Sequence, residues 1–267
     1  KVIRIGLDRD LEGWRPYKGQ RDLNGEIIDD REYGINDYDR VLIIDERTQA
    51  VAKCITKWLK ANGRFSKTIV FCVDQDHAER MRMALVNENP DLMQENSKYI
   101  MRITSDDDDG KKQLDYFIDA NEKYPALVTT SKLLTTGVDC KTCKLIVLDS
   151  VINSMTEFKQ IIGRGTRLYP DQGKEYFTIM DFRDDCRLFS DPDFDGNPVV
   201  IIDGGDGGEG WEPGETGTPD PGPEDPDTPG DPSAPFPEGG SDGPGGTFDP
   251  PDPEPPQAKK YHVNGVT

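Results

Sequence analysis

Short apolar runs alternate with amphipathic stretches along the first two hundred residues of the chain. The runs predict buried strands at 41–44, 68–73, 99–103, 126–130, 145–148 and 176–180. Helices are predicted between them, at 48–59, 76–87, 111–120 and 155–162, and Asp74 is the expected N-cap of the second. Continuous apolar strands that alternate with helices indicate an α/β fold with a parallel sheet and helices on both faces. The loops at the carboxyl ends of such strands are where ligands usually bind.

The two ends of the sequence suggest a piece of a longer protein. Residues 1–7 alternate like a strand but include no initiator methionine, and residues 258–267 become strand-like again after a long polar stretch. We therefore expect residues 1–47 to be a lead-in from an absent first lobe and 48–202 to form the main lobe. Residues 258–267 are expected to begin a following domain.

Composition separates a second region from that lobe. The whole chain of 267 residues has a formal net charge of −19. The stretch 203–257 holds 15 acidic and no basic side chains. It also holds 15 of the 21 prolines and 14 of the 27 glycines. Such a stretch buries too little apolar surface to offset the entropy of ordering, so we expect a disordered, acidic Gly/Pro-rich linker.

Nothing in the sequence indicates export or membrane insertion. The apolar runs are far shorter than the roughly 20 residues that span a bilayer, and the first residues do not resemble a signal peptide. The five cysteines are an odd number, which favours free thiols in a reducing compartment over a disulfide framework. We expect a cytoplasmic protein without a membrane partner.

One string after the strand at 145–148 combines arginines with glycines. Gln160, Arg164 and Arg167 are spaced by four and three residues, so a continuous helix would place them on one face. Gly163 and Gly165 permit a close backbone approach or a break in the helix. Two guanidiniums on one face suit a phosphate group, because each offers a planar fork of donors. The alternative is a pair of surface arginines that pair with acidic residues.

Taken together, three strings resemble motifs IV, V and VI of superfamily 2 helicases, in the order found in the second RecA-like lobe. They are TIVF at 68–71, LLTTGVD at 133–139 and QIIGRGTRL at 160–168. The longer strings TTGVDCKTCKLIVLD and NSMTEFKQIIGRGTRL resemble the motor (R) subunit of type I restriction endonucleases. The resemblance covers about residues 1–202, and it implies a RecA-like fold and an ATP-dependent translocase of double-stranded DNA.

The resemblance implies roles for individual residues. Arg164 and Arg167 match the catalytic motif VI arginines, which stabilise charge on the γ-phosphate of ATP. The positions implied near ATP are Gln160, Gly163, Gly137 and Asp139. The positions implied near nucleic acid are Thr129, Thr130, Ser131 and Phe71. For the last four a structural role is an open alternative, since Phe71 suits a core and the hydroxyl residues suit the end of a strand. Thr136 stands where RNA helicases of this superfamily often carry arginine.

Some parts of a complete motor are missing from the sequence. No phosphate-binding loop of the form G-x-x-x-x-G-K-[ST] occurs, so ATP and Mg²⁺ would be bound mainly by the absent first lobe. The string LIIDE at 42–46 mimics a Walker B strand, but we interpret Asp45 as part of a helix N-cap region. No nuclease site is recognisable. We therefore expect this chain alone to be inactive, and its partners to be the upstream lobe, double-stranded DNA and the modification and specificity subunits.

Other candidate sites are weaker. Cys140 and Cys143 have zinc-like spacing but no second pair, His77 is expected to be a solvated imidazole, and the acidic run at 106–109 is expected to be a solvated loop. No metal site is therefore predicted. Two other functions stay open: a different superfamily 2 motor, such as an RNA helicase or repair translocase, and a non-catalytic assembly scaffold.

Overall fold

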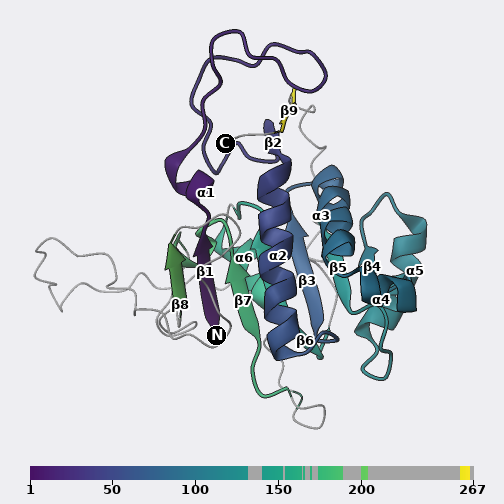
Figure 1. Ribbon diagram of the computed structural model, residues 1–267. Coiled ribbons are helices and arrows are strands. Elements are labelled where there is room, and N and C mark those ends of the chain that lie inside the picture. The colour runs from purple at the N-terminus through teal and green to yellow at the C-terminus, as the bar shows by residue number, and fades with distance from the viewer. Residues whose placement is uncertain are drawn as a thin grey trace, which may run out of the picture. The chain divides into compact units, whose positions relative to one another are not determined.

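The computed structural model describes residues 1–131, 140–152, 154–163, 165, 169, 174–188, 200–203 and 259–264. Its main feature is a seven-stranded sheet in the order β4-β5-β3-β6-β7-β1-β8, in which all neighbouring strands are parallel (Figure 1). The strands are β1 Val2–Gly6, β3 Lys67–Cys72, β4 Ile100–Arg102, β5 Leu127–Thr130, β6 Cys143–Asp149, β7 Thr178–Asp181 and β8 Val200–Asp203. The predicted α/β fold with a parallel, RecA-like sheet is confirmed.

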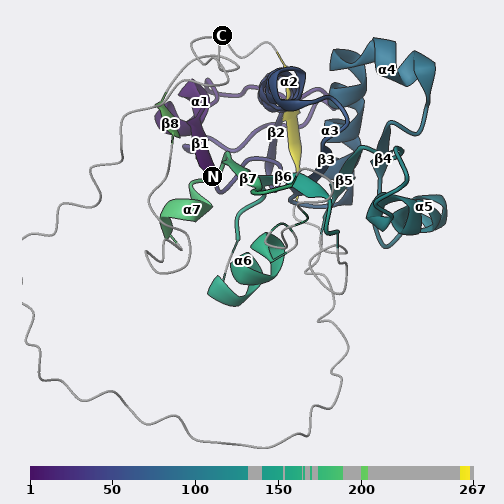
Figure 2. The ribbon, with the colours of Figure 1, turned by 90° about the horizontal axis from the view of Figure 1, so that it is seen from below.

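Helices cover both faces of this sheet. They are α1 Asp8–Glu12, α2 Asp45–Asn62, α3 Gln75–Glu88, α4 Pro90–Glu95, α5 Asp108–Ile118, α6 Met155–Ile162 and α7 Asp185–Leu188. Figure 2 shows α2 and α3 on one face of the sheet and α6 and α7 on the other. None of the helices in the described part of the chain is both long enough and apolar enough to cross a bilayer.

Each face has its own hydrophobic core. Val51 and Ile55 of α2 pack with Leu85 of α3 in one cluster, and Phe158 of α6 packs with Phe117 of α5 in the other. All five are almost completely buried. Full burial of side chains of this kind contributes about 1.5–3 kcal/mol each, so the helix faces that the hydrophobic period predicted are the ones that hold the layers together.

The main sheet includes a strand from the expected lead-in. β1 lies between β7 and β8, with Ile3 opposite Met180 on one side and Val200 on the other. Ile3 and Ile5 face one core cluster and Val2 faces the other, as the alternation along a strand requires. The lobe therefore begins before the boundary expected at residue 48.

A second, two-stranded parallel sheet joins β2 (Leu42–Ile44) to β9 (Tyr261–Val263). The described part of the segment 258–267, expected to start a following domain, thus pairs with the lobe. Asp45 also differs from its predicted role. The N-cap of α2 is Ile44, which makes no side-chain cap, and Asp45 is the first helical residue and lies 2.8 Å from His262 Nε2. Most of the expected linker lies outside the described residues.

Candidate functional site

Polar residues gather at the carboxyl edge of the sheet. β6 ends at Asp149, β7 ends at Asp181, and β3 is followed shortly by Asp74, the N-cap of α3. Asp74 accepts a hydrogen bond from the backbone N–H of His77 at 2.8 Å, as predicted for an N-cap. Because β3, β6 and β7 are parallel neighbours, the residues that follow them meet at one edge.

Six ionisable side chains meet at this edge almost without solvent contact. We call them the buried ion network: Asp10, Asp39, Arg47, His77, Asp149 and Arg183. Each side chain is at most 2% exposed. Three carboxylates therefore face two guanidiniums and an imidazole, and a third guanidinium, Arg80, reaches Asp39 from α3 at 3.0 Å. Buried charges persist only when they are paired in this way.

The hydrogen bonds of the buried ion network connect distant parts of the chain. Asp149 Oδ1 accepts from Arg47 Nη1 at 2.8 Å and from Arg183 Nε at 2.9 Å. Arg47 also donates to both carboxylate oxygens of Asp10, at 2.8 and 3.1 Å. Arg183 Nη2 donates to Asp39 Oδ2 at 2.7 Å. The end of β6, the start of α2, the residues after β7 and the segment before β2 are thus held together.

The charges in the buried ion network determine its ionisation. Burial opposes ionisation of Asp149, but Arg47 and Arg183 outweigh burial and hold the pKa of this carboxyl well below its usual range. Burial likewise opposes ionisation of Asp39, and His77 and Arg183 lower its pKa overall. Both carboxylates are therefore ionised at neutral pH and offer permanent acceptors to the guanidiniums.

His77 is buried, which corrects the expectation of a solvated imidazole. The backbone N–H of Val73 donates to its Nδ1 at 3.2 Å, which leaves Nε2 to face the carboxylates. Nε2 lies 3.3 Å from Asp149 Oδ2 and 3.7 Å from Asp39 Oδ2. The imidazole therefore links the loop after β3 to the end of β6, because α3 turns it inward from its first turn.

Asp39, His77 and Asp149 also lie close enough to one another to surround a metal ion. The two carboxylates are already engaged, because Asp149 Oδ1 accepts from Arg47 and Arg183 and Asp39 Oδ2 accepts from Arg183, all at 2.7–2.9 Å. A divalent cation there would face two guanidiniums at close range, and Coulomb repulsion opposes its binding. The donor set does not fit a metal, and we assign these residues to ion pairing.

A second pair of carboxyl groups follows β7. Asp181 accepts from the backbone N–H groups of Arg183 and Cys186, at 2.9 and 2.7 Å. Asp185 accepts from the backbone N–H of Ile152 at 3.1 Å. Burial, reinforced by Asp181, raises the pKa of Asp185 to about 7. Asp185 therefore changes its protonation near neutral pH while it holds the residues that lead into α6.

The helix that carries the first part of motif VI is α6. Its N-cap Ser154 accepts from the backbone N–H of Glu157 at 3.1 Å, and Gln160 is exposed on its last turn. The helix ends at Ile162 with Gly163 as its C-cap. The end of the helix thus coincides with the first of the two glycines, which the sequence had offered as a possible break. Arg164 and Arg167 themselves lie outside the described residues.

Two side chains hold the turn after α6. A Cβ on Gly165 would lie 2.8 Å from Cγ of Phe177, so only glycine fits against this ring. The buried Lys174 ammonium donates to the carbonyls of Gly165 and Lys141, both at 2.8 Å. Lys174 thereby joins the motif VI turn to the loop before β6.

The expected nucleic-acid residues divide by exposure. Phe71 and Thr129 are buried in β3 and β5, and Thr130 is buried and donates to the carbonyl of Ile103 at 2.7 Å. Ser131, which follows β5, is half-buried. Phe71, Thr129 and Thr130 therefore have the structural role that was left open for them. Of the four residues, only Ser131 is accessible. Gly137 and Asp139 of motif V lie outside the described residues.

The remaining candidates have structural roles. The thiols of Cys140 and Cys143 are free and buried, and they contact the carbonyls of Phe117 and Leu145. Within the acidic run, Asp107 is the N-cap of α5 and accepts from the backbone N–H of Gly110 at 2.9 Å.

Arg47, Asp149 and Arg183 were not predicted as site residues from the sequence. Asp149 had a visible signal, because it is a charged residue directly after a buried strand. Arg183 follows β7 by two residues in a similar way. Arg47 had no signal in the sequence. Its partners Asp10, Asp149 and Asp39 are 37, 102 and 8 residues away, and only the fold brings them together.

Known proteins resemble this chain over its described lobe. Residues 46–169 match the family described as the helicase conserved C-terminal domain. The EcoAI type I restriction enzyme endonuclease subunit of Escherichia coli is 59% identical over 203 residues, which are 76% of this chain and 25% of that protein. The EcoKI endonuclease subunit of E. coli strain K12 is 34% identical over 165 residues, 60% of this chain and 14% of that protein. The chain thus spans a quarter or less of these curated relatives.

A solved structure is similar as well. It is described as a fragment of a putative HsdR subunit of a type I restriction enzyme from Vibrio vulnificus YJ016. It is 39% identical, with a TM-score of 0.62, and the match covers 77% of this chain and 37% of that chain.

Proposed function

We propose that this chain, which contains the C-terminal helicase lobe of a type I restriction enzyme R subunit, forms half of an ATP-dependent translocase of double-stranded DNA. The observation that carries the proposal is the position of motif VI. Its first part lies on α6, directly after the central strand β6, and Gly165 is clamped between Phe177 and Lys174. A fixed turn at this point suits residues that must reach a phosphate group with little freedom.

Arg164 and Arg167 are the proposed catalytic residues. Their guanidiniums would stabilise the charge that develops during phosphoryl transfer, an effect of about 10³–10⁵ in rate for arginine fingers. Gln160, Gly163, Gly137 and Asp139 are proposed to lie near ATP. ATP and Mg²⁺ would be held mainly by the upstream RecA-like lobe, so the chain alone would hydrolyse no ATP.

Fewer residues of this lobe are proposed to contact DNA than the sequence suggested. Ser131 is accessible at the end of β5, whereas Phe71, Thr129 and Thr130 serve the sheet. Contacts to backbone phosphates would supply affinity without sequence information, so recognition of a DNA site would belong to the specificity subunit. The modification subunit is the other proposed partner.

The test uses the intact subunit that contains this chain, assembled with its partner subunits. ATP hydrolysis would be measured with linear duplex DNA, with single-stranded RNA and without nucleic acid, for wild type, Arg164→Ala and Arg167→Ala. The control is Arg15→Ala, because Arg15 is an exposed arginine paired with Asp30. We expect stimulation by duplex DNA that falls at least about 10³-fold in both variants and is unchanged in the control.

Other outcomes would contradict parts of the proposal. Full activity of both arginine variants would remove their catalytic role. Stimulation by RNA in preference to duplex DNA would assign the lobe to another kind of superfamily 2 motor. An absence of hydrolysis in the wild-type complex would favour the scaffold.

A further inference from the structure

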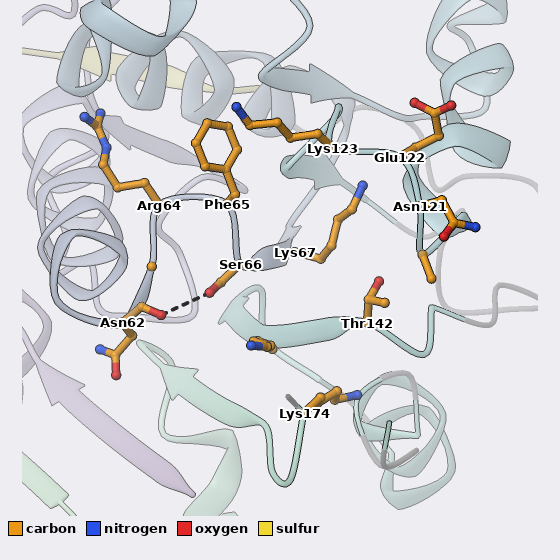
Figure 3. Close-up of a pocket in the computed structure, with 13 residues that line it drawn as sticks. Asn62, Arg64, Phe65, Ser66, Lys67, Asn121, Glu122, Lys123, Thr142 and Lys174 are labelled. Atoms are coloured by element: carbon orange, nitrogen blue, oxygen red, sulfur yellow. Dashed lines mark hydrogen bonds between the residues drawn. The ribbon is translucent and has the colours of Figure 1, made fainter. Parts of the chain in front are cut away.

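A cavity of about 520 Å³ lies at the opposite edge of the sheet, at the amino ends of β3, β5 and β6 (Figure 3). Its walls come from the residues just before these strands and from Lys174. Five basic side chains and one acidic side chain, Glu122, line it, although the chain as a whole carries a net charge of −19. Neither the helicase motifs nor the buried ion network uses this cavity.

Two of the five basic side chains are neutralised elsewhere. Arg64 Nη2 donates to Asp91 at 2.8 Å, and Figure 3 shows its side chain on the far side of Phe65 from Lys67. Lys123 lies 3.4 Å from Glu95 and 3.8 Å from the ring centre of Phe65. The other three basic side chains, Lys67, Lys144 and Lys174, line the cavity together with one carboxylate, Glu122.

Lys67, one of these three lysines, is almost completely buried, and its ammonium is desolvated. The residue is only 6% exposed, and its Nζ donates to the carbonyl of Pro125 at 2.7 Å. Burial lowers the pKa of this ammonium, so an anion beside it would relieve an unfavourable desolvation. Among the residues that the structure describes, no carboxylate lies within 4 Å of Lys67 or of Lys144.

We propose that this cavity binds a phosphate-bearing small anion, with Lys67 and Lys144 as its charged contacts. Two ammonium groups with no carboxylate of the described residues within 4 Å match the two or more negative charges of a phosphate or diphosphate. Thr142, which also lines the cavity, adds a hydroxyl donor, and the volume is that of ordinary small-molecule sites. A duplex backbone would not reach the buried Nζ of Lys67, so a small ligand is favoured over DNA.

The cavity also has a structural connection to motif VI. Lys174 lines it and holds the carbonyl of Gly165. Binding of an anion there would bring negative charge near this ammonium. The site does not depend on the proposed function, because it requires only the lysines and the cavity.

The experiment titrates the 267-residue chain with inorganic pyrophosphate in a calorimeter, at low and at moderate salt. The variants are Lys144→Ala, Lys144→Glu and Lys67→Met, where methionine keeps the apolar stem of the buried lysine. The control is Lys53→Ala, an exposed lysine of α2 outside the cavity. We expect saturable binding at one site, about tenfold weaker in Lys144→Ala and unchanged in the control. Lys144→Glu should abolish binding even if Lys67→Met fails to fold.

Two further measurements separate this site from others. Arg167→Ala should bind pyrophosphate as wild type does, since binding that depends on Arg167 would belong to motif VI and overturn the proposal. A short duplex DNA should compete poorly with pyrophosphate. Equal loss of DNA binding in Lys144→Glu would identify a DNA backbone as the source of the phosphate and overturn the small-ligand assignment. Absence of saturable binding in wild type would also overturn it.

Discussion

Arg183 Nε lies 2.9 Å from Asp149 Oδ1, and both side chains are completely buried. This contact joins the end of β6 to the residues after β7, and the same guanidinium continues to Asp39. Charge pairing therefore holds the loop ends at the carboxyl edge of the sheet. Packing alone would leave these loop ends freer, because a buried pair tolerates little change in geometry.

Replacement of Asp149 by asparagine is expected to destabilise the lobe strongly. Asparagine keeps the volume of the side chain but leaves Arg47 and Arg183 with an uncompensated buried charge. Loss of one partner from a buried pair costs about 3–5 kcal/mol in free energy of unfolding. Urea unfolding of the chain measures this directly, with Asp30→Asn as the control because Asp30 pairs with Arg15 on the surface. A decrease in the free energy of unfolding below about 1 kcal/mol, as expected for a surface ion pair, would show that the buried ion network contributes little to the stability of the lobe.

The stability contributed by Asp185 is expected to fall as the pH rises. Its folded pKa of about 7 lies above the ordinary value of 3.8, so the folded state binds this proton more tightly than the unfolded chain. The contribution is present below about pH 4 and is lost as the pH rises to about 7. Asp185→Asn stays neutral and can still accept from the N–H of Ile152. The free energy of unfolding of the variant should therefore rise relative to that of wild type as the pH increases across this window. The difference should exceed about 1 kcal/mol at pH 8.

The matched control for this prediction is its neighbour, Asp184→Asn. Asp184 is 45% exposed and has a positive φ of 61°, which asparagine tolerates. Its stability difference from wild type includes loss of the ion pair with Arg4 and is measured at the same pH values for comparison. If the stability difference between Asp185→Asn and wild type were the same at pH 4 and pH 8, the carboxyl would be ionised in the folded state throughout.

Apolar runs predicted strands β3 to β7, and amphipathic stretches predicted helices α2, α3, α5 and α6, because periodicity records which faces are buried. Strand β8 was not predicted, and the run at 41–44 forms β2 outside the main sheet. The helix over residues 155–162 was predicted with the bounds that α6 has, and Asp74 was predicted as an N-cap. His77 was not, because the imidazole is buried by residues more than 30 positions away in both directions. Local sequence patterns do not reveal pairs between residues so far apart in the chain. The role of Arg47 could not be predicted for the same reason.

Replacement of Gly165 by alanine is expected to disturb the motif VI turn. The new Cβ would overlap the ring of Phe177, and relief of such overpacking typically costs about 1–3 kcal/mol. In the intact subunit, DNA-stimulated ATP hydrolysis should fall, and the double variant Gly165→Ala, Phe177→Ala should recover part of it. Gly19→Ala is a control for the substitution itself, because nothing lies within 4 Å of the Cβ there, although its positive φ adds strain. Equal activity of Gly165→Ala and wild type would show that the turn need not be fixed.

Removal of the Tyr261 ring is expected to show that β9 belongs to the lobe. Tyr261 is 4% exposed and packs with Ile28, Tyr33 and Leu42, which lie more than two hundred residues earlier in the chain. Truncation of a buried aromatic side chain costs about 3–5 kcal/mol, whereas Tyr17, which is 73% exposed, should tolerate alanine. Urea unfolding of Tyr261→Ala and Tyr17→Ala compares the two. If the two variants were equally stable, β9 would contribute nothing to the lobe, and the segment would instead behave as the start of another domain. A selective loss in Tyr261→Ala would mean that the acidic stretch leaves the lobe after β8 and that the chain returns to the same lobe at β9.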